Sequence, residues 1–110
     1  MGISTHILDT TRGRPASGVL VTLEQKNGDR WVTLGEGTTD ADGRVKALLV
    51  QSPEIGTYRI TFRVAPYFEL LGVAAFYPEV TITFLVAATG QHFHVPLLLN
   101  PFGFSTYRGS

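Results

Sequence analysis

The stretch "GTYRITFRV" at residues 56–64 decides the fold of this 110-residue chain. Apolar and polar side chains alternate along it, so that Tyr58 and Ile60 point to one side of an extended backbone while Arg59 points to the other. This period of two predicts a β-strand that is buried on one face. The stretch "EVTITFLVA" at residues 79–87 repeats the pattern with the same preference for β-branched and aromatic residues, and it predicts a second strand of the same kind.

Shorter segments of the same character extend the pattern over the whole chain. The predicted strands cover residues 4–9, 19–24, 31–35, 44–48, 56–64, 79–87, 91–99 and 102–108. Turn sequences such as "RGRPASG", "KNGD", "DADG" and "NPFG" separate several of them, since Gly, Asn, Asp and Pro suit tight reversals. Many short strands with little helical periodicity predict an all-β fold, a two-sheet antiparallel β-sandwich.

One segment departs from the strand pattern. In "APYFELLG", residues 65–72, the side chains of Tyr67, Leu70 and Leu71 have the i, i+3, i+4 spacing of one helix face, and Gly72 follows at a position suited to a helix end. The sequence therefore predicts one short helix between two strands.

Length and composition bound the class of protein. Hydrophobic residues make up 44% of the chain and charged residues only 16%, which predicts a single folded domain over residues 1–110. So few charged residues cannot cover a large solvent-exposed surface, which favours an oligomer that buries part of that surface.

Charge and cysteine content exclude several functions. Lys and Arg together number 9, as do Asp and Glu, and there is no basic run, so neither a nucleic acid nor an anionic membrane is expected as a partner. The absence of cysteine excludes disulfides and a thiolate nucleophile. The start lacks the basic and apolar regions of a signal peptide, and no apolar run is long enough to span a bilayer, so a cytoplasmic protein is expected.

The three histidines are the main candidates for chemistry. His92 and His94 are two residues apart on a predicted strand and therefore share a face, and His6 lies on another strand. Two interpretations remain open from the residues alone: a three-histidine zinc site, or partly buried imidazoles held by hydrogen bonds. A serine nucleophile is disfavoured because no G-x-S-x-G motif is present, and Asp40 with Asp42 in "DADG" is typical of a turn.

Several segments together resemble a known family. They are "STHILDTTRGRPASGVLVTLE", "DADGR", "GTYRITF", "FYPEVTITF" and "HFHVPLLLNPFGFSTYRGS", and they run in order from about Ile3 to Ser110. The chain is similar in these segments to the transthyretin-related 5-hydroxyisourate hydrolases, and the ending "YRGS" resembles the tetrapeptide that distinguishes those enzymes from transthyretins.

The resemblance implies both a fold and a reaction. The implied fold is an eight-stranded transthyretin-like sandwich with one short helix, assembled as a homotetramer, a dimer of dimers with the sites at the dimer–dimer interface. The implied reaction is the hydrolysis of 5-hydroxyisourate to 2-oxo-4-hydroxy-4-carboxy-5-ureidoimidazoline in urate degradation. Water opens the ring at its N1–C6 amide, and neither a metal nor another cofactor is needed.

The resemblance also implies the site residues. The implied catalytic residues are His6, Arg44, His94 and Ser110. The implied substrate-binding residues are His6, Arg44, Tyr107, Arg108 and Gly109. We expect His6 to activate water, Arg44 to stabilise the oxyanion, and His94, oriented by Ser110, to help protonate the leaving nitrogen, although the roles of the two histidines are interchangeable at this stage. His92 is expected to be solvated and without a role.

A transthyretin-like carrier of a small hydrophobic ligand, such as a thyroid hormone, is the main alternative. A carrier channel is expected to be lined by small and apolar groups, whereas His6, Arg44, His94 and Tyr107 would make the same channel polar and narrow. These residues favour the hydrolase.

Overall fold

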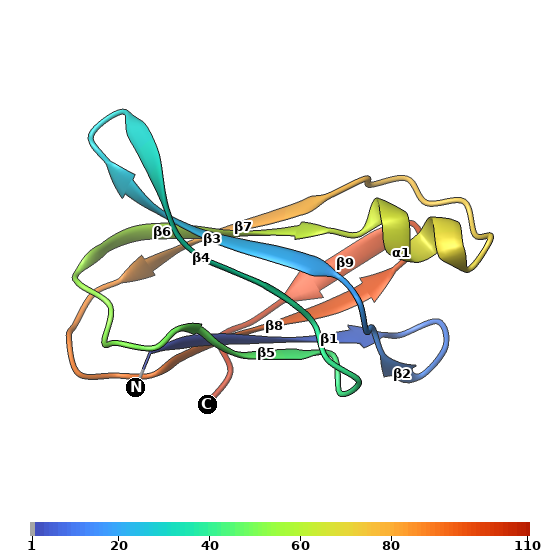
Figure 1. Ribbon diagram of the computed structural model, residues 1–110, viewed down its shortest axis with the longest axis horizontal. Helices are drawn as coiled ribbons and strands as arrows, with labels where there is room; N and C mark the ends of the chain where they lie inside the picture. Colours follow the sequence, from blue (N-terminus) through green and yellow to red (C-terminus); the bar gives the residue numbers. More distant parts are fainter. Residues whose placement is uncertain (1) are drawn as a thin grey trace.

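The computed structural model describes residues 2–110, which form two packed β-sheets and one short helix (Figure 1). In chain order the elements are β1 (Ile3–Asp9), β2 (Arg14–Pro15), β3 (Leu20–Asn27), β4 (Arg30–Thr38), β5 (Arg44–Leu49), β6 (Gly56–Arg63), α1 (Ala65–Leu70), β7 (Val80–Val86), β8 (Phe93–Asn100) and β9 (Gly103–Thr106). Each of the eight predicted strands overlaps one of these. The additional strand, β2, is a two-residue pairing with the end of β1 inside the segment predicted as a turn.

The two sheets divide the strands by layer. One has four strands in the order β4-β3-β6-β7, and all of its pairings are antiparallel. The other has the order β2-β1-β8-β9, with β5 also paired to β1. Within it β1 and β8 run parallel, so the prediction of a purely antiparallel sandwich is wrong at this pair. Parallel pairing is possible because a long connection, which includes the whole opposite sheet, separates these two strands in the chain.

The alternation predicted for the two longest strand patterns is confirmed. Tyr58, Ile60 and Phe62 of β6 are at most 1% exposed, and Val80 and Val86 of β7 are equally buried. They pack against apolar side chains of the other sheet in one core cluster, which includes Ile3, Ile7, Val95, Leu97 and Leu99. The core therefore lies between the layers, and it fixes which face of each strand points outward.

The helix is where the sequence predicted, but of the three apolar side chains at helical spacing only Tyr67 is buried. Leu70 is 91% exposed, and the buried side chains are Tyr67 and Phe68. A helix of six residues makes less than two turns, so its contacts are set by how it sits on the sandwich end and not by a long apolar stripe. Gly72 follows the helix with a φ of 68° and its N–H bonds the carbonyl of Glu69, which agrees with the predicted helix end. No helix among residues 2–110 has the length and apolar character needed to cross a bilayer.

A buried hydrogen bond holds the helix to β1. The hydroxyl of Tyr67 donates to Oδ2 of Asp9 at 2.6 Å, and Asp9 is only 1% exposed. The other carboxylate oxygen of Asp9 accepts the backbone N–H groups of Thr11 and Arg12. Burial is the main cause that raises the pKa of Tyr67, and the bond to Asp9 raises it further.

Removing this hydroxyl should destabilise the fold. In Tyr67→Phe the buried carboxylate of Asp9 loses one partner, so the free energy of unfolding is expected to fall by about 1–3 kcal/mol. Urea unfolding followed by circular dichroism measures the change. Tyr77→Phe is the control, because the structure gives the Tyr77 hydroxyl no hydrogen bond within residues 2–110 and Tyr77 is 39% exposed. Equal stability of the two variants would contradict the prediction.

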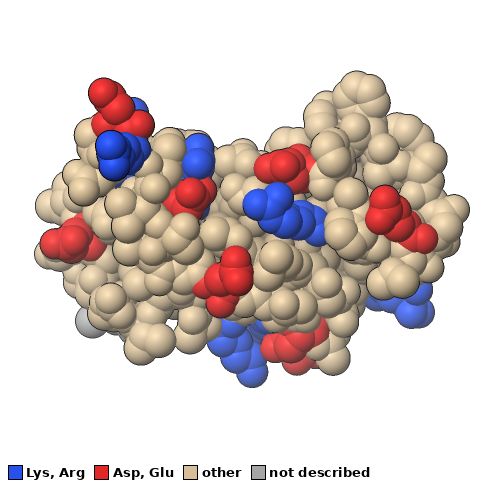
Figure 2. Space-filling view, turned by 45° about the horizontal axis from the view of Figure 1, so that its top comes forward, with Lys and Arg blue, Asp and Glu red and all other residues tan. Residues whose placement is uncertain are grey.

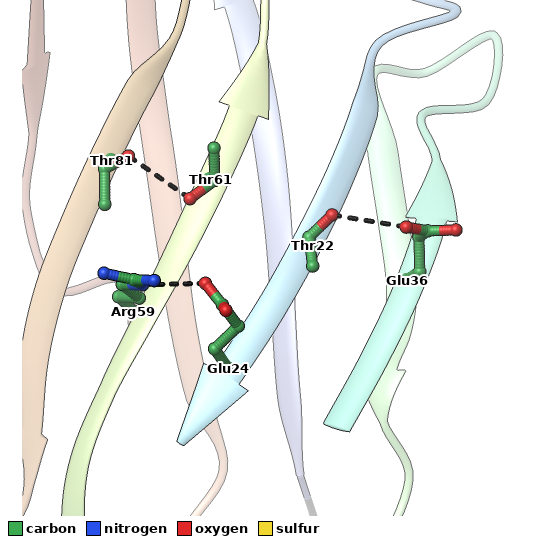
Figure 3. Close-up of polar contacts among 6 residues, drawn as sticks. All are labelled: Thr22, Glu24, Glu36, Arg59, Thr61 and Thr81. Carbon is green, nitrogen blue, oxygen red and sulfur yellow. Dashed lines mark hydrogen bonds and ion pairs between the residues drawn. The ribbon is translucent and has the colours of Figure 1, made fainter. Parts of the chain in front are cut away.

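Polar pairs connect the strands on the outer face of the four-stranded sheet (Figure 3). Arg59 Nε donates to Glu24 Oε1 at 2.7 Å, Thr61 and Thr81 bond through their hydroxyls, and Thr22 bonds Glu36. Charged groups of both signs are intermixed on the face seen in Figure 2, without a basic patch of the kind that binds nucleic acids. The six polar side chains drawn in Figure 3 thus make cross-strand contacts.

Candidate active site

The functional candidates lie on the outer face of the five-stranded sheet. Ile3 and Ile7 of β1 are buried in the core, and therefore Ser4 and His6 point away from it. His6 is paired with Arg44 of β5 on one side, and Ser4 is paired with His94 of β8 on the other. The register thus brings His6, Arg44 and His94 onto one surface.

A hollow of about 250 Å³ opens on this surface. Its lining consists of Ser4, Thr5, Arg44, Lys46, His92, His94 and Ser110. His6 is not part of the lining but lies on the strand beside it, opposite Arg44. Sequence reasoning missed Ser4 and Lys46, although each is two residues from a predicted site residue on the same strand and so faces the same way.

His94 is held through a different residue than predicted. Its Nδ1 is 2.8 Å from the Ser4 hydroxyl, which is also 2.8 Å from Nε2 of His92. The backbone N–H of Gly2 donates to Nδ1 of His92 at 3.1 Å. Ser4 and not Ser110 therefore orients His94, while Ser110 lines the hollow. His92 is exposed, as expected, but it is tied into this chain of hydrogen bonds.

Gly109 brings the end of the chain against His94. The two residues form an isolated antiparallel bridge in which the Gly109 N–H donates to the His94 carbonyl at 2.9 Å. A Cβ atom on Gly109 would lie 2.6 Å from Cδ2 of the His94 ring, well inside van der Waals contact. Only glycine allows this approach, which explains its place among the predicted site residues.

Tyr107 and Arg108 are near the hollow but do not line it. They line a second hollow of about 320 Å³ together with His94 and residues of β7. Arg108 donates from Nη2 to Gln91 Oε1 at 2.8 Å, and its guanidinium is 4.7 Å from the ring centre of Phe93. Tyr107 is 58% exposed. The single chain therefore places Tyr107 and Arg108 beside His94 but in a different hollow from Arg44 and Ser110.

The "DADG" turn positions Arg44. Oδ1 of Asp40 accepts the backbone N–H groups of Asp42 at 2.9 Å and of Arg44 at 3.0 Å, and the pKa of Asp40 is lowered mainly by the bond from Arg44. The turn interpretation of this segment is confirmed. The Asp40 carboxylate organises the backbone where β5 begins, next to His6.

The metal interpretation gains no support from the geometry of the described residues. Residues 2–110 contain no group of three histidine or acidic side chains placed to hold one ion. His92 and His94 instead share the Ser4 hydroxyl as a hydrogen-bond partner. The hydrogen-bonded interpretation of these two imidazoles is confirmed.

The surroundings of His94 keep its imidazole neutral. Burial is the largest cause that lowers the pKa of His94 below its ordinary value of 6.5, and the nearby charges of His6, His92 and Arg44 lower it further. An NMR titration should therefore give His94 a midpoint below 6.5.

The same shift sets a pH dependence of stability. In the unfolded chain His94 takes up a proton below its ordinary pKa of 6.5, whereas in the folded protein it does so only at lower pH. The unfolded state thus binds more protons in this window, so this residue makes the free energy of unfolding fall as the pH drops below 6.5. His94→Asn should remove that part of the pH dependence, and a midpoint at or above 6.5 in the wild type would contradict both expectations.

Comparisons with known proteins agree with the fold. The model of the HIUase/Transthyretin family matches residues 3–109. The chain is 48% identical over 109 residues to the 5-hydroxyisourate hydrolase of Salmonella dublin, covering 98% of this chain and 80% of that protein.

Two solved structures have the same architecture. One is the 5-hydroxyisourate hydrolase of Klebsiella pneumoniae, with a TM-score of 0.88, 36% identity and 100% coverage of both chains. The other is sea bream transthyretin in complex with thyroxine, with a TM-score of 0.90, 30% identity and coverage of 99% of this chain and 95% of that one. Because the family model and these relatives extend over nearly all of the sequence, the chain belongs to the HIUase/Transthyretin family.

Proposed function

We propose that this protein hydrolyses 5-hydroxyisourate to 2-oxo-4-hydroxy-4-carboxy-5-ureidoimidazoline in the degradation of urate. The observation that carries the proposal is the convergence of two imidazoles and a guanidinium, from His6, His94 and Arg44, on one outer face of the sandwich. Hydrolysis of a cyclic amide requires a base for water and donors for the carbonyl oxygen, and these three side chains supply them. Relatives that carry the name of this hydrolase and match nearly the full chain support it.

In the proposed mechanism His6 takes a proton from water, and the water oxygen attacks C6 of the substrate. The guanidinium of Arg44 stabilises the negative charge that develops on the carbonyl oxygen, because its planar set of donors fits an oxyanion. The C6–N1 bond then breaks, and the proton held by His6 passes to N1. His94 lies beside Arg44 around the hollow and contributes a further hydrogen-bond donor. No metal or other cofactor enters these steps.

Substrate positioning is assigned to groups at the end of the chain. We propose that Gly109 and Ser110, which adjoin His94, form one wall of the site, and that Tyr107 and Arg108 close it from the neighbouring edge. The exposure of Tyr107, 58%, leaves its ring available for such a contact.

We propose further that the protein assembles as a homotetramer. The outer edges of β7 and β9 have no partner strand among residues 2–110, and apolar side chains are exposed there, with Leu85 65% and Phe104 40% exposed. Both features suit pairing with further copies of the chain. Light scattering after gel filtration should give about four times the mass of one chain, and a monomer at working concentration would overturn this assembly.

The test of the proposed function is the decay of freshly made 5-hydroxyisourate. Urate oxidase generates it from urate in the cuvette, and ultraviolet absorbance and circular dichroism are followed with and without the protein. We expect faster decay and an excess of one product enantiomer. Decay at the spontaneous rate would overturn the proposal.

A matched variant tests the chain end in the same assay. Truncation after Thr106 removes the four residues that the proposal uses as a wall, and we expect it to abolish the acceleration. A truncated protein that remains folded and fully active would show that these residues take no part in the reaction.

The alternative of a hydrophobic carrier rests on the likeness to sea bream transthyretin in complex with thyroxine, but the hollow beside His94 disfavours it. Arg44, Lys46 and His94 make the hollow polar, whereas a site for an apolar ligand is lined mostly by apolar groups. Thyroxine binding without hydrolysis would be the result that supports the carrier.

A further inference from the structure

A nearly buried hydroxyl connects two imidazoles at the candidate active site. Ser4 is 7% exposed, and its Oγ is 2.8 Å from His92 Nε2 and 2.8 Å from His94 Nδ1. At the outer end of this chain the backbone N–H of Gly2 points at His92 Nδ1 with a separation of 3.1 Å. This series of hydrogen bonds thus begins at a group that can only be a donor, because a backbone N–H does not accept hydrogen bonds.

The Gly2 donor determines which atom carries the proton in each hydrogen bond of this series. His92 Nδ1 accepts from Gly2, so a neutral His92 carries its proton on Nε2 and donates it to Ser4 Oγ. A serine hydroxyl has a single proton, and with Oγ already accepting from His92 that proton is directed at His94 Nδ1. His94 Nδ1 is therefore an acceptor, and the proton of neutral His94 lies on Nε2.

We propose that Ser4 is a positioning residue that holds neutral His94 in the tautomer protonated at Nε2, so that His94 acts as a hydrogen-bond donor and not as the base. The kinetic part of this proposal rests on the proposed hydrolase function, whereas the tautomer itself does not.

The assignment has a consequence for the roles of the two histidines. Nε2 of His94 has no hydrogen-bond partner within residues 2–110, and the residue lines the hollow together with Arg44 and Lys46. The hollow therefore presents donors from three side chains, which suits a substrate rich in carbonyl oxygens. A nitrogen that carries a proton cannot take another from water, and His6 is left as the imidazole that activates water.

The Gly109 contact fixes the same ring from the other edge. Gly109 packs against Cδ2 of His94, while Nδ1 faces Ser4. The ring is held between a hydroxyl and a backbone, which prevents a flip that would exchange its two nitrogens. A fixed ring is what allows one hydroxyl to select one tautomer.

The first experiment reads the tautomer directly. Long-range ¹H–¹⁵N correlation spectra of the histidine side chains, recorded on the full-length protein above pH 7, should show His94 protonated at Nε2 and bare at Nδ1. In Ser4→Ala we expect a mixture of the two tautomers, and in Ser4→Thr, which keeps the hydroxyl, a return to the wild-type pattern. Protonation at Nδ1 in the wild type would overturn the proposal whatever the activity.

The second experiment measures kcat and KM for 5-hydroxyisourate in the same variants. Loss of an orienting partner of a catalytic histidine should lower kcat roughly 10- to 100-fold in Ser4→Ala with little change in KM. Ser4→Thr should recover most of the loss. Thr10→Val is the control, because it removes a side-chain bond between the same two strands at the opposite end of β1, to the carbonyl of Leu99, without touching an imidazole. It should leave both the tautomer and kcat unchanged.

The outcomes separate this proposal from the proposed function. A wild-type protein with the Nε2–H tautomer but no hydrolase activity would overturn the function and support the assignment of the protons. An active wild type in which Ser4→Ala, folded by circular dichroism, keeps both the tautomer and kcat would overturn the role of Ser4 and leave the function standing.

Discussion

Replacing His6 with asparagine is expected to lower kcat for 5-hydroxyisourate by about 10²- to 10⁴-fold, the usual effect of losing a general base. Asparagine keeps hydrogen-bonding capacity and a similar size but cannot take a proton from water. His94→Asn should also reduce kcat, since it removes the Nε2–H donor next to Arg44. The measurement is the initial rate of substrate decay at saturating substrate, with the fold checked by circular dichroism.

A surface change on the other sheet is the control for this experiment. Thr33→Asn introduces the same side chain at an exposed position of β4, away from the histidines, and should leave kcat unchanged. If His6→Asn retained full kcat, His6 would not be the base, and the division of roles between the two histidines would be wrong.

Gly109→Ala is expected to reduce activity by about 100-fold while the sandwich stays folded, because a displacement of about 1 Å in a catalytic group has a cost of that order. The added Cβ would lie 2.6 Å from Cδ2 of His94 and 3.3 Å from its Cβ and Cγ. Either the ring or the chain end must move, and both belong to the proposed site. The φ of Gly109 is not in the left-handed region, so the backbone conformation itself tolerates alanine.

The matched control is another glycine near the chain end. At Gly103 the atom nearest to an added Cβ is Asn100 Oδ1 at 3.6 Å, an ordinary contact. Gly103→Ala should therefore keep full activity. Equal rates for the two alanine variants would show that the close approach at Gly109 has no effect on the reaction. A shifted His94 ring resonance in Gly109→Ala alone would trace the loss to that ring.

The elements with a strong local pattern were predictable from the sequence. The sequences of β6 and β7 alternate, and the apolar residues that are buried in them are those the pattern predicted, although Thr61 of β6 is buried as well. The helix α1 was located by the i, i+3, i+4 spacing of apolar side chains and by Gly72, but the spacing did not predict which of them are buried, since Phe68 and not Leu70 packs into the core. In so short a helix the periodicity is too brief to outweigh the shape of the surface on which it packs.

The sequence by itself determined the strand segments, the outward face of His6 and His94, and, through family resemblance, the set of residues proposed to act. Only the tertiary structure decided what those residues touch. Ser4 meets His92 and His94 across 88 and 90 residues of chain, and this contact follows from the parallel pairing of β1 with β8. Alternation fixes the face of a strand, but register between strands distant in sequence depends on the packing of the whole core, so no local pattern could reveal this contact.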